Sequence, residues 1–545
     1  MKTQMQSFLW ALIGAATLGM AGCGGSGGIS IPPPPATYRI AGTVAGLGAA
    51  QSVTLLNNGG DSMVVTANAP FQFSTSQLAS SAYAVTVGTQ PPGQTCTVAN
   101  GTGTVVSADV SSVSVTCTNN PTHTVAANVT GLASGATLEL RLNTTITLTT
   151  TSNMTSNFPT PIAEGLAYAV AIGTQPAFQT CTITGGTGTM GTSNVLVAVG
   201  CVDNKQFALV TNFRNAANGN SISVFEVNQG SGALTPVAGS PFSSQGVAPL
   251  GMAVNAAATH VLVTNSEDNT VVSFGINPVT GALSMVGTPY ASPGRFPGDV
   301  AVNRTSTAAY VVHGGSVNLT ALTLSPSTGA ISAAAQYALG GTASITYVRR
   351  TVAVTPAGNF VFVGDGGLGN VAAWAVNATT GVLTAVGTYS SGGTPAAVAV
   401  NAAGTQLLVG NSNGNVVRMA IAGDGSLTVI GTATPSSTSE FSGLTYNPAG
   451  TMAFASHVGG EVVPFLVTAS TGELSSVPGS PFSSGGNAPA GIAVNPNGAF
   501  ALVSNRNNDN VAVLAIAANG VLTPVASSPV ATGPDSRSVA FAHKR

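Results

Sequence analysis

Charged side chains are scarce in this sequence: Asp, Glu, Lys and Arg together make up 6% of its 545 residues, against roughly 25% in an average soluble protein. The formal net charge is only −2. The chain therefore lacks the basic surface that binds nucleic acid and the cluster of basic residues that binds a membrane surface. Ser, Thr, Asn and Gly must supply most of the polar surface, so each charged loop residue is a candidate for function.

The sequence also lacks helical patterning and the common cofactor motifs. Outside the N-terminus, no long segment has apolar residues at helical spacing. The 68 glycines, with abundant Val and Thr, favour many short strands joined by tight turns. No phosphate-binding glycine loop, HExxH zinc motif, nucleophile elbow or EF-hand is present. We predict an all-β protein of about three or four domains, with no cofactor and no metal site.

The first 23 residues have the pattern of an export signal. Lys2 precedes a short apolar run over residues 8–18, and small residues and Cys23 follow. Residues 18–23 (LGMAGC) resemble the lipobox of bacterial lipoproteins, in which the cysteine becomes the lipidated first residue, although Met20 stands where that pattern prefers Leu. The other interpretation is an ordinary secretory signal with an incidental cysteine. We predict a lipoprotein signal peptide over residues 1–23 and a lipid anchor in the membrane on Cys23.

The residues after Cys23 indicate where the protein is held. Gly24 is not the Asp that retains such lipoproteins in the inner membrane. We therefore expect an exported protein of the cell envelope, anchored in the outer membrane. Residues 24–36 are rich in Gly and Ser and then contain four consecutive prolines. Such a segment is flexible at first and then stiff, and we assign it as a linker.

Two copies of a small domain follow, over residues 37–119 and 122–203. The segment YAVTVGTQP at 83–91 returns as YAVAIGTQP at 168–176, an offset of 85 residues. Alternating apolar and polar residues, as in VSVT at 113–116, indicate strands with one buried face. We predict two β-sandwich repeats with an immunoglobulin-like fold.

Each small domain contains two cysteines. They are Cys96 and Cys117 in the first copy and Cys181 and Cys201 in the second. One pair per domain in an exported chain favours one disulfide in each. A metal or redox pair is the alternative, but neither a nearby histidine nor a CxxC spacing supports it. We predict two structural disulfides.

A different period begins near Phe207. One strand motif recurs seven times: AVN at 253–255, 301–303, 399–401 and 493–495, AVT at 353–355, TYN at 445–447, and AFA at 540–542. The middle residues are 48, 52, 46, 46, 48 and 47 residues apart. Within each period, turns and apolar runs indicate four strands, which is typical of a propeller blade.

The two ends of this region complement each other. The first unit begins at Phe207 without the recurring strand, whereas the tail over 538–542 is such a strand with no blade after it. Joining them completes a blade and removes an open sheet edge. We predict a seven-bladed β-propeller over residues 204–545, closed by the C-terminal strand.

These repeats resemble the lactonase propeller family, which includes 6-phosphogluconolactonase and the carboxymuconate cyclases. The turn TGEL at 471–474 and the strands LVTN at 262–265 and LVSN at 502–505 carry the resemblance, which covers about 340 residues. It implies the fold more specifically than the activity, because one fold supports many functions.

Charged residues gather in the loops that a propeller would place on one face, around the mouth of its channel. They are Arg214, Glu267, Asp268, Arg295, His313, Arg349, Arg350, Asp365, Glu440, His457, Arg506, Asp509, Asp535 and Arg537. The opposite turns hold little beyond Arg304, Asp424 and Glu473. We predict an anion-binding mouth in which Arg295, Arg349, Arg350 and Arg537 grip a carboxylate. The alternative is that long loops carry polar residues and structural ion pairs in any case.

Catalysis at this mouth would need a proton acceptor. Lactonases of the resembled family use a constellation of His, acid and Arg, with histidines just ahead of the first strand of a blade, where this chain has Pro249 and Pro395. His313 and His457 stand on other loops, and either is a candidate general base beside Glu440.

Two functions remain open at this stage. In the first, the propeller is a non-catalytic module that binds an anionic small molecule, a glycan or a protein at its mouth. In the second, the protein is an enzyme, namely a lactonase, which is a carboxylic ester hydrolase, acting on a carboxylate-bearing lactone.

We expect Arg349 and Arg350 to lie in a loop ahead of a strand that begins at Thr351.

The lipid anchor can be tested directly. Replacing the candidate cysteine, Cys23→Ala, is expected to abolish metabolic labelling with a fatty acid and to release the protein from membranes, because the acyl chains are attached through its thiol. Gly22→Ala, which keeps the thiol, is the matched control. Equal labelling of the wild type and Cys23→Ala would contradict the lipoprotein prediction.

Overall fold

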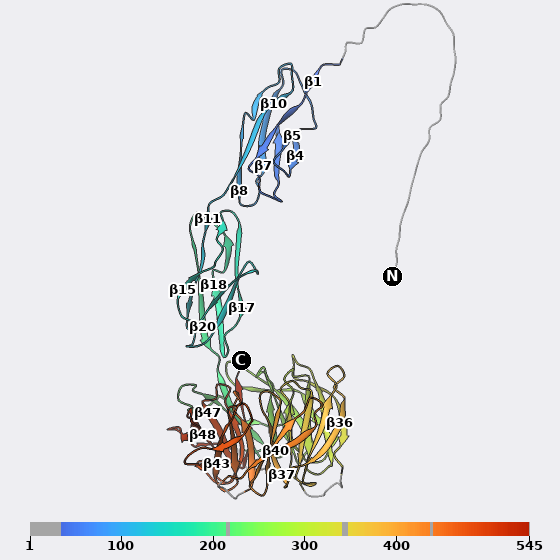
Figure 1. Ribbon diagram of the computed structural model, residues 1–545, viewed down its shortest axis with the longest axis vertical. Coiled ribbons are helices and arrows are strands. Elements are labelled where there is room, and N and C mark those ends of the chain that lie inside the picture. Colours follow the sequence, from blue (N-terminus) through green and yellow to red (C-terminus); the bar gives the residue numbers. More distant parts are fainter. Residues whose placement is uncertain (1–33, 214–218, 341–346, 436–439, 544–545) are drawn as a thin grey trace, which may run out of the picture. The chain divides into compact units, whose positions relative to one another are not determined.

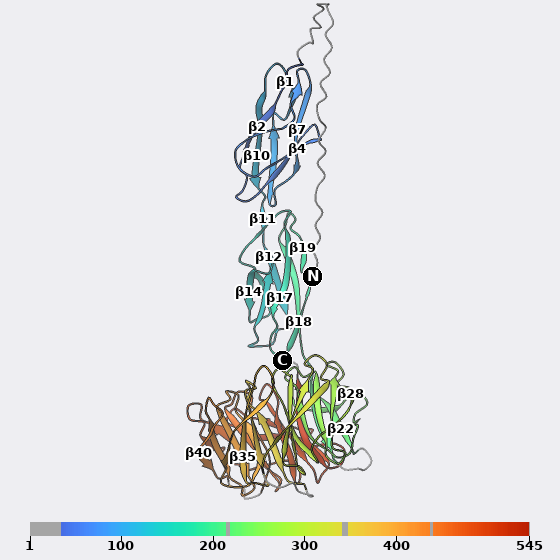
Figure 2. The same ribbon diagram turned by 90° about the vertical axis from the view of Figure 1, so that its right-hand side faces the viewer.

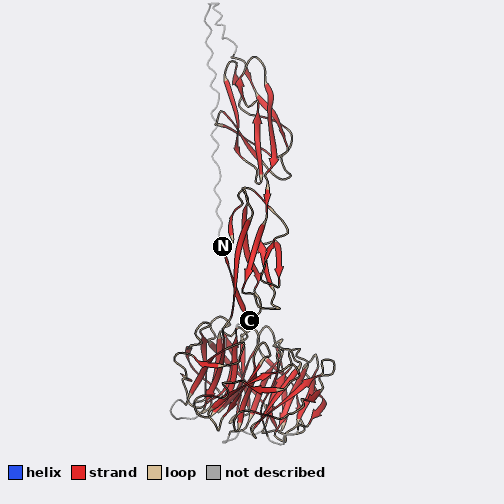
Figure 3. Cartoon of the chain, turned by 90° about the vertical axis from the view of Figure 1, so that its left-hand side faces the viewer, coloured by secondary structure: helices blue, strands red, loops and turns tan. Residues whose placement is uncertain are grey.

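The computed structural model describes residues 34–213, 219–340, 347–435 and 440–543, which are coloured along the sequence in Figure 1. Their regular structure consists of strands, drawn in red in Figure 3, which confirms the all-β prediction. The predicted signal peptide with Cys23, most of the linker, and Arg214 lie outside the described residues. No helix in the described part of the chain is long and apolar enough to cross a membrane.

The first small domain consists of two four-stranded sheets and one short strand pair. Their orders are β5-β2-β10-β8, β4-β3-β7-β9 and β1-β6. The strands are β1 (Thr37–Tyr38), β2 (Ile40–Ala45), β3 (Val53–Asn57), β4 (Asp61–Val65), β5 (Pro70–Gln72), β6 (Gln77–Leu78), β7 (Ala82–Thr89), β8 (Gln94–Ala99), β9 (Thr102–Thr104) and β10 (Val110–Asn119).

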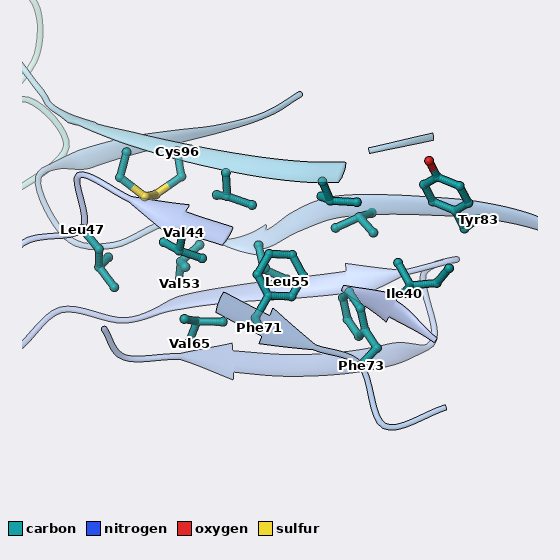
Figure 4. Close-up of a cluster of buried hydrophobic side chains, with 14 of the residues drawn as sticks. Ile40, Val44, Leu47, Val53, Leu55, Val65, Phe71, Phe73, Tyr83 and Cys96 are labelled. Carbon is teal, nitrogen blue, oxygen red and sulfur yellow. A yellow bond between two sulfur atoms is a disulfide. The ribbon is translucent and has the colours of Figure 1, made fainter. Parts of the chain in front are cut away.

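The core of this domain lies between its two four-stranded sheets. Val53 and Leu55 of β3 are fully buried and alternate with less buried residues, as the period of two in a strand requires. They meet Ile40 and Val44 from β2 of the other sheet, and Phe71 fills the space between them (Figure 4). The alternation seen in the sequence thus corresponds to one inward-facing row per strand.

The second small domain repeats this strand order, with sheets β15-β12-β20-β18 and β14-β13-β17-β19 and the pair β11-β16. The strands are β11 (Thr122–His123), β12 (Val125–Thr130), β13 (Leu138–Leu142), β14 (Ile146–Thr150), β15 (Thr155–Asn157), β16 (Ile162–Ala163), β17 (Ala167–Thr174), β18 (Gln179–Thr184), β19 (Thr187–Thr189) and β20 (Val195–Asp203).

Both predicted disulfides are present. Cys96 is bonded to Cys117 and Cys181 to Cys201. In each pair the two cysteines are directly opposite one another on neighbouring antiparallel strands, β8 with β10 and β18 with β20. The bond therefore lies within one sheet, whereas the disulfide of antibody domains joins the two sheets. The immunoglobulin-like assignment stays a prediction.

The described residues after the small domains form seven sheets, and the predicted propeller is confirmed. The strands are β21 (Gln206–Asn212), β22 (Ser221–Val227), β23 (Leu234–Pro236), β24 (Phe242–Ser243), β25 (Pro249–Val254), β26 (His260–Asn265), β27 (Thr270–Ile276), β28 (Leu283–Ala291), β29 (Pro297–Val302), β30 (Ala308–His313), β31 (Asn318–Leu324), β32 (Ile331–Ala338), β33 (Arg350–Val354), β34 (Phe360–Asp365), β35 (Asn370–Val376), β36 (Leu383–Ser390), β37 (Pro395–Val400), β38 (Gln406–Asn411), β39 (Val416–Ile421), β40 (Leu427–Ala433), β41 (Phe441–Tyr446), β42 (Met452–His457), β43 (Glu461–Val467), β44 (Leu474–Ser476), β45 (Phe482–Ser483), β46 (Pro489–Val494), β47 (Phe500–Asn505), β48 (Asn510–Ile516), β49 (Leu522–Pro524), β50 (Val530–Ala531) and β51 (Ser536–His543).

The blades are numbered in chain order, and blades 2 to 7 are each built from sequentially adjacent strands, from β25-β26-β27-β28 in blade 2 to β46-β47-β48-β49 in blade 7. Within the propeller, Figure 2 shows β22 and β28 at one side and β35 and β40 at the other. The second strand of a blade, such as β26 or β47, is buried along its whole length. Both faces of a blade are covered by its neighbours, so these strands read as continuous apolar runs.

The recurring asparagine closes the turn between the first two strands of a blade. The Oδ1 atom of Asn255 accepts hydrogen bonds from the backbone N–H groups of Thr259 and His260, both at 2.9 Å. Asn303, Asn401 and Asn447 accept the same pair of bonds in their own blades. The Asn of the repeated motif therefore recurs because its side chain holds the turn that follows it.

The C-terminal strand completes blade 1, as the sequence predicted. In that blade the order is β23-β22-β21-β51, and β51 pairs antiparallel with β21. Val539 and Ala542 of β51 are buried. The Nε2 atom of Gln206 lies 3.1 Å from Nδ1 of His543, so side chains as well as backbone join the two ends.

The closing strand can be removed by truncation. Ending the chain after Asp535 deletes β51, including Val539, whose burial contributes roughly 1.5–3 kcal/mol. The ladder hydrogen bonds lost with it contribute about 1 kcal/mol each. Against a total stability of about 5–15 kcal/mol, we expect the propeller to lose its cooperative thermal transition. Truncation after His543, which keeps β51, is the control. An equal melting temperature for both would show that the strand does not close the ring.

Candidate functional site

A cavity of about 440 Å³ lies at the centre of the propeller. The first strand of every blade contributes to its wall: β25, β29, β33, β37, β41, β46 and β51. At the third residue before each recurring middle position stand Gly251, Asp299, Thr351, Ala397, Gly443, Gly491 and Ser538, and all seven line the cavity. Six of these seven residues are small, which leaves the centre of the ring hollow.

Four arginines line this cavity: Arg349, Arg350, Arg506 and Arg537. The predicted carboxylate grip included Arg349, Arg350 and Arg537, and the structure brings these three together. Arg295 is exposed outside the cavity, with its guanidinium carbon 5.4 Å from the centre of the Phe296 ring. Arg506 belongs to the charged residues predicted around the mouth, but it is not among the four arginines predicted to bind a carboxylate.

Arg349 crosses from blade 4 to blade 6. Its guanidinium donates hydrogen bonds to the backbone carbonyls of Phe441 at 3.1 Å and Ser442 at 2.5 Å. Glu440 Oε1 lies 3.8 Å from Nη1 of the same arginine. Arg349 thus holds two inner strands together, while its side chain, 34% exposed, still faces the cavity.

Arg350 is a structural residue, and its predicted placement in a loop is wrong. It is the first residue of β33, is 5% exposed, and donates from Nε to Asp365 Oδ2 at 3.0 Å. It also donates to the carbonyl of His313 in blade 3 at 2.7 Å. A residue with these partners cannot be removed without cost, because buried charges must be paired.

Arg537 is likewise paired. Its Nε atom lies 2.7 Å from Oδ1 of Asp535, and its Nη2 donates to Oδ2 of the same carboxylate at 3.0 Å. The guanidinium also lies over the ring of Phe213, 4.6 Å from its centre. A two-point contact of this kind fixes the orientation of the guanidinium.

Arg506 differs from the other three. It lies in the loop after β47, where its backbone N–H donates to the carbonyl of Ala488. Within the described residues, its side chain makes no hydrogen bond or ion pair. Of the arginines that line the cavity, Arg506 therefore has the guanidinium most available to a ligand.

Asp299 lines the cavity but is not among the charged loop residues predicted from the sequence, because it lies inside an inner strand, β29. Its carboxylate accepts hydrogen bonds from the backbone N–H of Val352 at 3.0 Å and of Val300 at 2.9 Å. Burial raises the pKa of Asp299 to about 6, although these bonds and the positive charge of Arg349 oppose the rise. Aligning the seven repeats would have revealed it, since the other blades carry an uncharged residue there.

The two predicted histidine bases do not line the cavity. His313 is fully buried at the end of β30, with Nε2 2.7 Å from the hydroxyl of Ser292, and burial lowers its pKa to about 4. His457 is also fully buried, with its ring centre 4.2 Å from that of Phe441. Of these three candidates, only Glu440 lines the cavity. Glu440 directly precedes β41 and His457 ends β42, both in blade 6, whereas His313 ends β30 in blade 3. Neither histidine ring lines the cavity, and the catalytic roles stay predictions.

The remaining predicted mouth residues lie elsewhere. Glu267, Asp268, Asp365, Asp509 and Asp535 do not line the cavity. Among the described residues, no group of three or more His, Cys, Asp or Glu side chains is placed to hold a metal ion.

The structural role of Arg350 can be measured. Arg350→Ala leaves Asp365 buried without its partner, so we expect a loss of roughly 3–5 kcal/mol in the free energy of unfolding. The double variant Arg350→Ala/Asp365→Ala should recover part of this loss, since the uncompensated charge is gone. Exposed Arg295→Ala is the control, with an expected change within about 0.5 kcal/mol. Equal denaturation midpoints for Arg350→Ala and the control would contradict the assignment.

Comparison with known proteins agrees with this architecture. The chain matches the family described as "Lactonase, 7-bladed beta-propeller" over residues 173–302, 291–438 and 444–543. A comparison with curated proteins gave no match.

Three solved structures illustrate the likeness. A putative 6-phosphogluconolactonase from Bacteroides fragilis has a TM-score of 0.55 and 20% identity, covering 62% of this chain and 98% of that one. A putative 6-phosphogluconolactonase from Bacteroides uniformis has a TM-score of 0.55 and 17% identity, covering 62% of this chain and 100% of that one. The periplasmic gluconolactonase PpgL of Pseudomonas aeruginosa has a TM-score of 0.52 and 18% identity, covering 63% of this chain and 100% of that one. At these identities the likeness establishes the fold and not the activity. The family match covers more than half of the chain, which therefore belongs to the lactonase family of seven-bladed β-propellers.

Proposed function

We propose that the propeller cavity binds a small carboxylate-bearing molecule, and that binding is the principal role of this exported, lipid-anchored protein. The observation that carries the proposal is the set of four guanidinium groups around one cavity in a chain with few charges. A volume of about 440 Å³ falls within the range of small-molecule sites. It favours a small ligand over a glycan chain or a protein surface as the occupant.

The electrostatics support an anion at one part of the wall. Arg350 and Arg537 are neutralised by Asp365 and Asp535, and Arg349 is engaged with backbone carbonyls. Arg506 is left to donate to a ligand carboxylate. Charge-assisted hydrogen bonds of this type are the stronger ones in proteins.

Lactone hydrolysis is the second candidate, and Asp299 is the observation in its favour. A carboxylate with a pKa of about 6 is well placed to accept a proton near neutral pH. In this reaction water would attack the lactone carbonyl and Asp299 would take the proton from that water. The bond between the carbonyl carbon and the ring oxygen would then break, and Asp299 would return the proton to the leaving ring oxygen, which gives a hydroxy acid. The fold shared with the P. aeruginosa gluconolactonase agrees with this candidate at the level of architecture.

One pair of assays separates the two functions. Titration calorimetry with gluconate and hexanoate is expected to show binding that Arg506→Ala weakens at least tenfold, because a charge-assisted hydrogen bond contributes roughly 1.5–3 kcal/mol. Arg295→Ala should bind like the wild type. A panel of lactones that includes glucono-1,5-lactone should show no turnover above the rate in buffer.

The opposite result would favour the enzyme. Turnover that falls as the pH drops through about 6, where Asp299 gains a proton, and that decreases at least 10²-fold in Asp299→Asn, would replace the binding proposal by lactone hydrolysis. Failure of both assays would remove the cavity as the functional site.

A further inference from the structure

The cavity has two charged residues of opposite sign without ion-pair partners. Among the described residues, the side chain of Arg506 makes no ion pair, and the carboxylate of Asp299 makes none either. Every other arginine of the wall is within 4 Å of a carboxylate oxygen: Arg349 of Glu440, Arg350 of Asp365 and Arg537 of Asp535. These two are the charged residues of the wall that form no ion pair, although the positive charge of Arg349 acts on Asp299.

The carboxylate of Asp299 is held in place by the backbone. Oδ1 accepts from its neighbour Val300, and Oδ2 accepts from Val352 on β33, the adjacent inner strand. The side chain is partly buried and still lines the cavity. Each oxygen of an ionised carboxylate accepts two hydrogen bonds, so Asp299 retains capacity to accept one from a ligand.

Arg506 and Asp299 lie on opposite sides of the ring. Arg506 belongs to blade 7 and Asp299 to blade 3, so blades 1 and 2 separate them on one side and blades 4, 5 and 6 on the other. Both residues line the same cavity. A single small molecule between them would meet a hydrogen-bond donor at one end and an acceptor at the other.

We propose that this cavity selects carboxylates that carry a hydrogen-bond donor, best an ammonium group, at their far end. This inference rests on the proposed function and gives it a ligand class: the carboxylate is held by Arg506 and the donor by Asp299. A carboxylate without such a donor would leave Asp299 desolvated and unpaired beside a second negative charge. Sites built around a buried polar group reject analogues that lack its partner.

Three acids of equal chain length test the selection: hexanoate, 6-hydroxyhexanoate and 6-aminohexanoate, each titrated calorimetrically into the purified full chain. The four-carbon series is run beside them as a second length. At one length or both, we expect the amino acid to bind at least tenfold more tightly than the unsubstituted acid, because it adds one charge-assisted hydrogen bond. The hydroxy acid should lie between them.

Variants of the two residues test which end of the ligand each of them binds. Arg506→Ala should weaken all three acids by a similar factor of at least ten, since each presents the same carboxylate. Asp299→Asn should bring the amino and unsubstituted acids to within about threefold of each other. Arg295→Ala and Asp424→Asn, which change the charge outside the cavity, are the matched controls and should behave as the wild type.

A pH series on the wild type provides a second test, because the amide of Asp299→Asn would face two backbone N–H groups and could disturb the fold. The other ionisable lining groups are Tyr347, Glu440 and the four arginines. Lowering the pH through about 6 protonates Asp299, whose positive neighbour Arg349 remains. The preference for the amino acid should then shrink, and binding of the unsubstituted acid should strengthen.

The outcomes are distinct. If the three acids bind equally at both lengths, and neither Asp299→Asn nor pH changes their ratio, the selection is overturned and the anion-binding proposal stands. If none of the acids binds at either length, both are overturned. A preference for the amino acid that disappears in Asp299→Asn, or in the wild type below pH 6, supports the selection.

Discussion

The pairing of β51 with β21 is the contact on which the rest of the propeller depends. It joins residues more than 300 positions apart, and it turns a row of blades into a closed ring. Without it, blade 1 would lose its inner strand and leave the edge of β21 unpaired, a surface that favours aggregation. The cavity exists only because all seven inner strands surround one axis, so its shape depends on the closure of the ring.

Within the ring, the few charges of the chain are divided between two tasks. Arg349 links the inner strands of blades 4 and 6, while Arg350 links blade 4 to a carbonyl of blade 3. Such contacts fix the distances across the channel and hold the wall rigid. Arg506 and Asp299 can then remain without ion-pair partners, and two backbone N–H groups orient the carboxylate of Asp299. A ligand site is more precise when its supporting contacts are already satisfied.

Much of the fold could be predicted from the sequence, because its causes are local and repeated. In four blades the Asn at the end of the recurring motif closes a turn with its own side chain, so the period marks the blades directly. The strand at 538–542 carries the recurring motif with no blade after it, and the first unit lacks that motif before Phe207. The two could therefore be assigned to one blade. The disulfides followed from one pair of cysteines in each small domain.

The site was less predictable, because it depends on where a side chain points. His313 and His457 end their strands beside charged loops, yet their rings are buried within the blades. Arg350 is adjacent to Arg349 and points to a buried carboxylate, whereas its neighbour faces the cavity. Asp299 was hidden in an apolar strand, and only the register of the seven repeats reveals that its position faces the centre of the ring.

The placement of the disulfides has a mechanical consequence. Each bridge joins the last strand of a small domain to a neighbour in the same sheet, across a sequence separation of 21 or 20 residues. When the chain is pulled from its ends, tension passes through the covalent bond and bypasses the residues between the two cysteines. At about 3.4 Å per extended residue, roughly 70 Å of each domain cannot be stretched out as long as the bond is intact. Reduction would release this length, so the oxidation state of the two cysteines sets how far each small domain can extend under load.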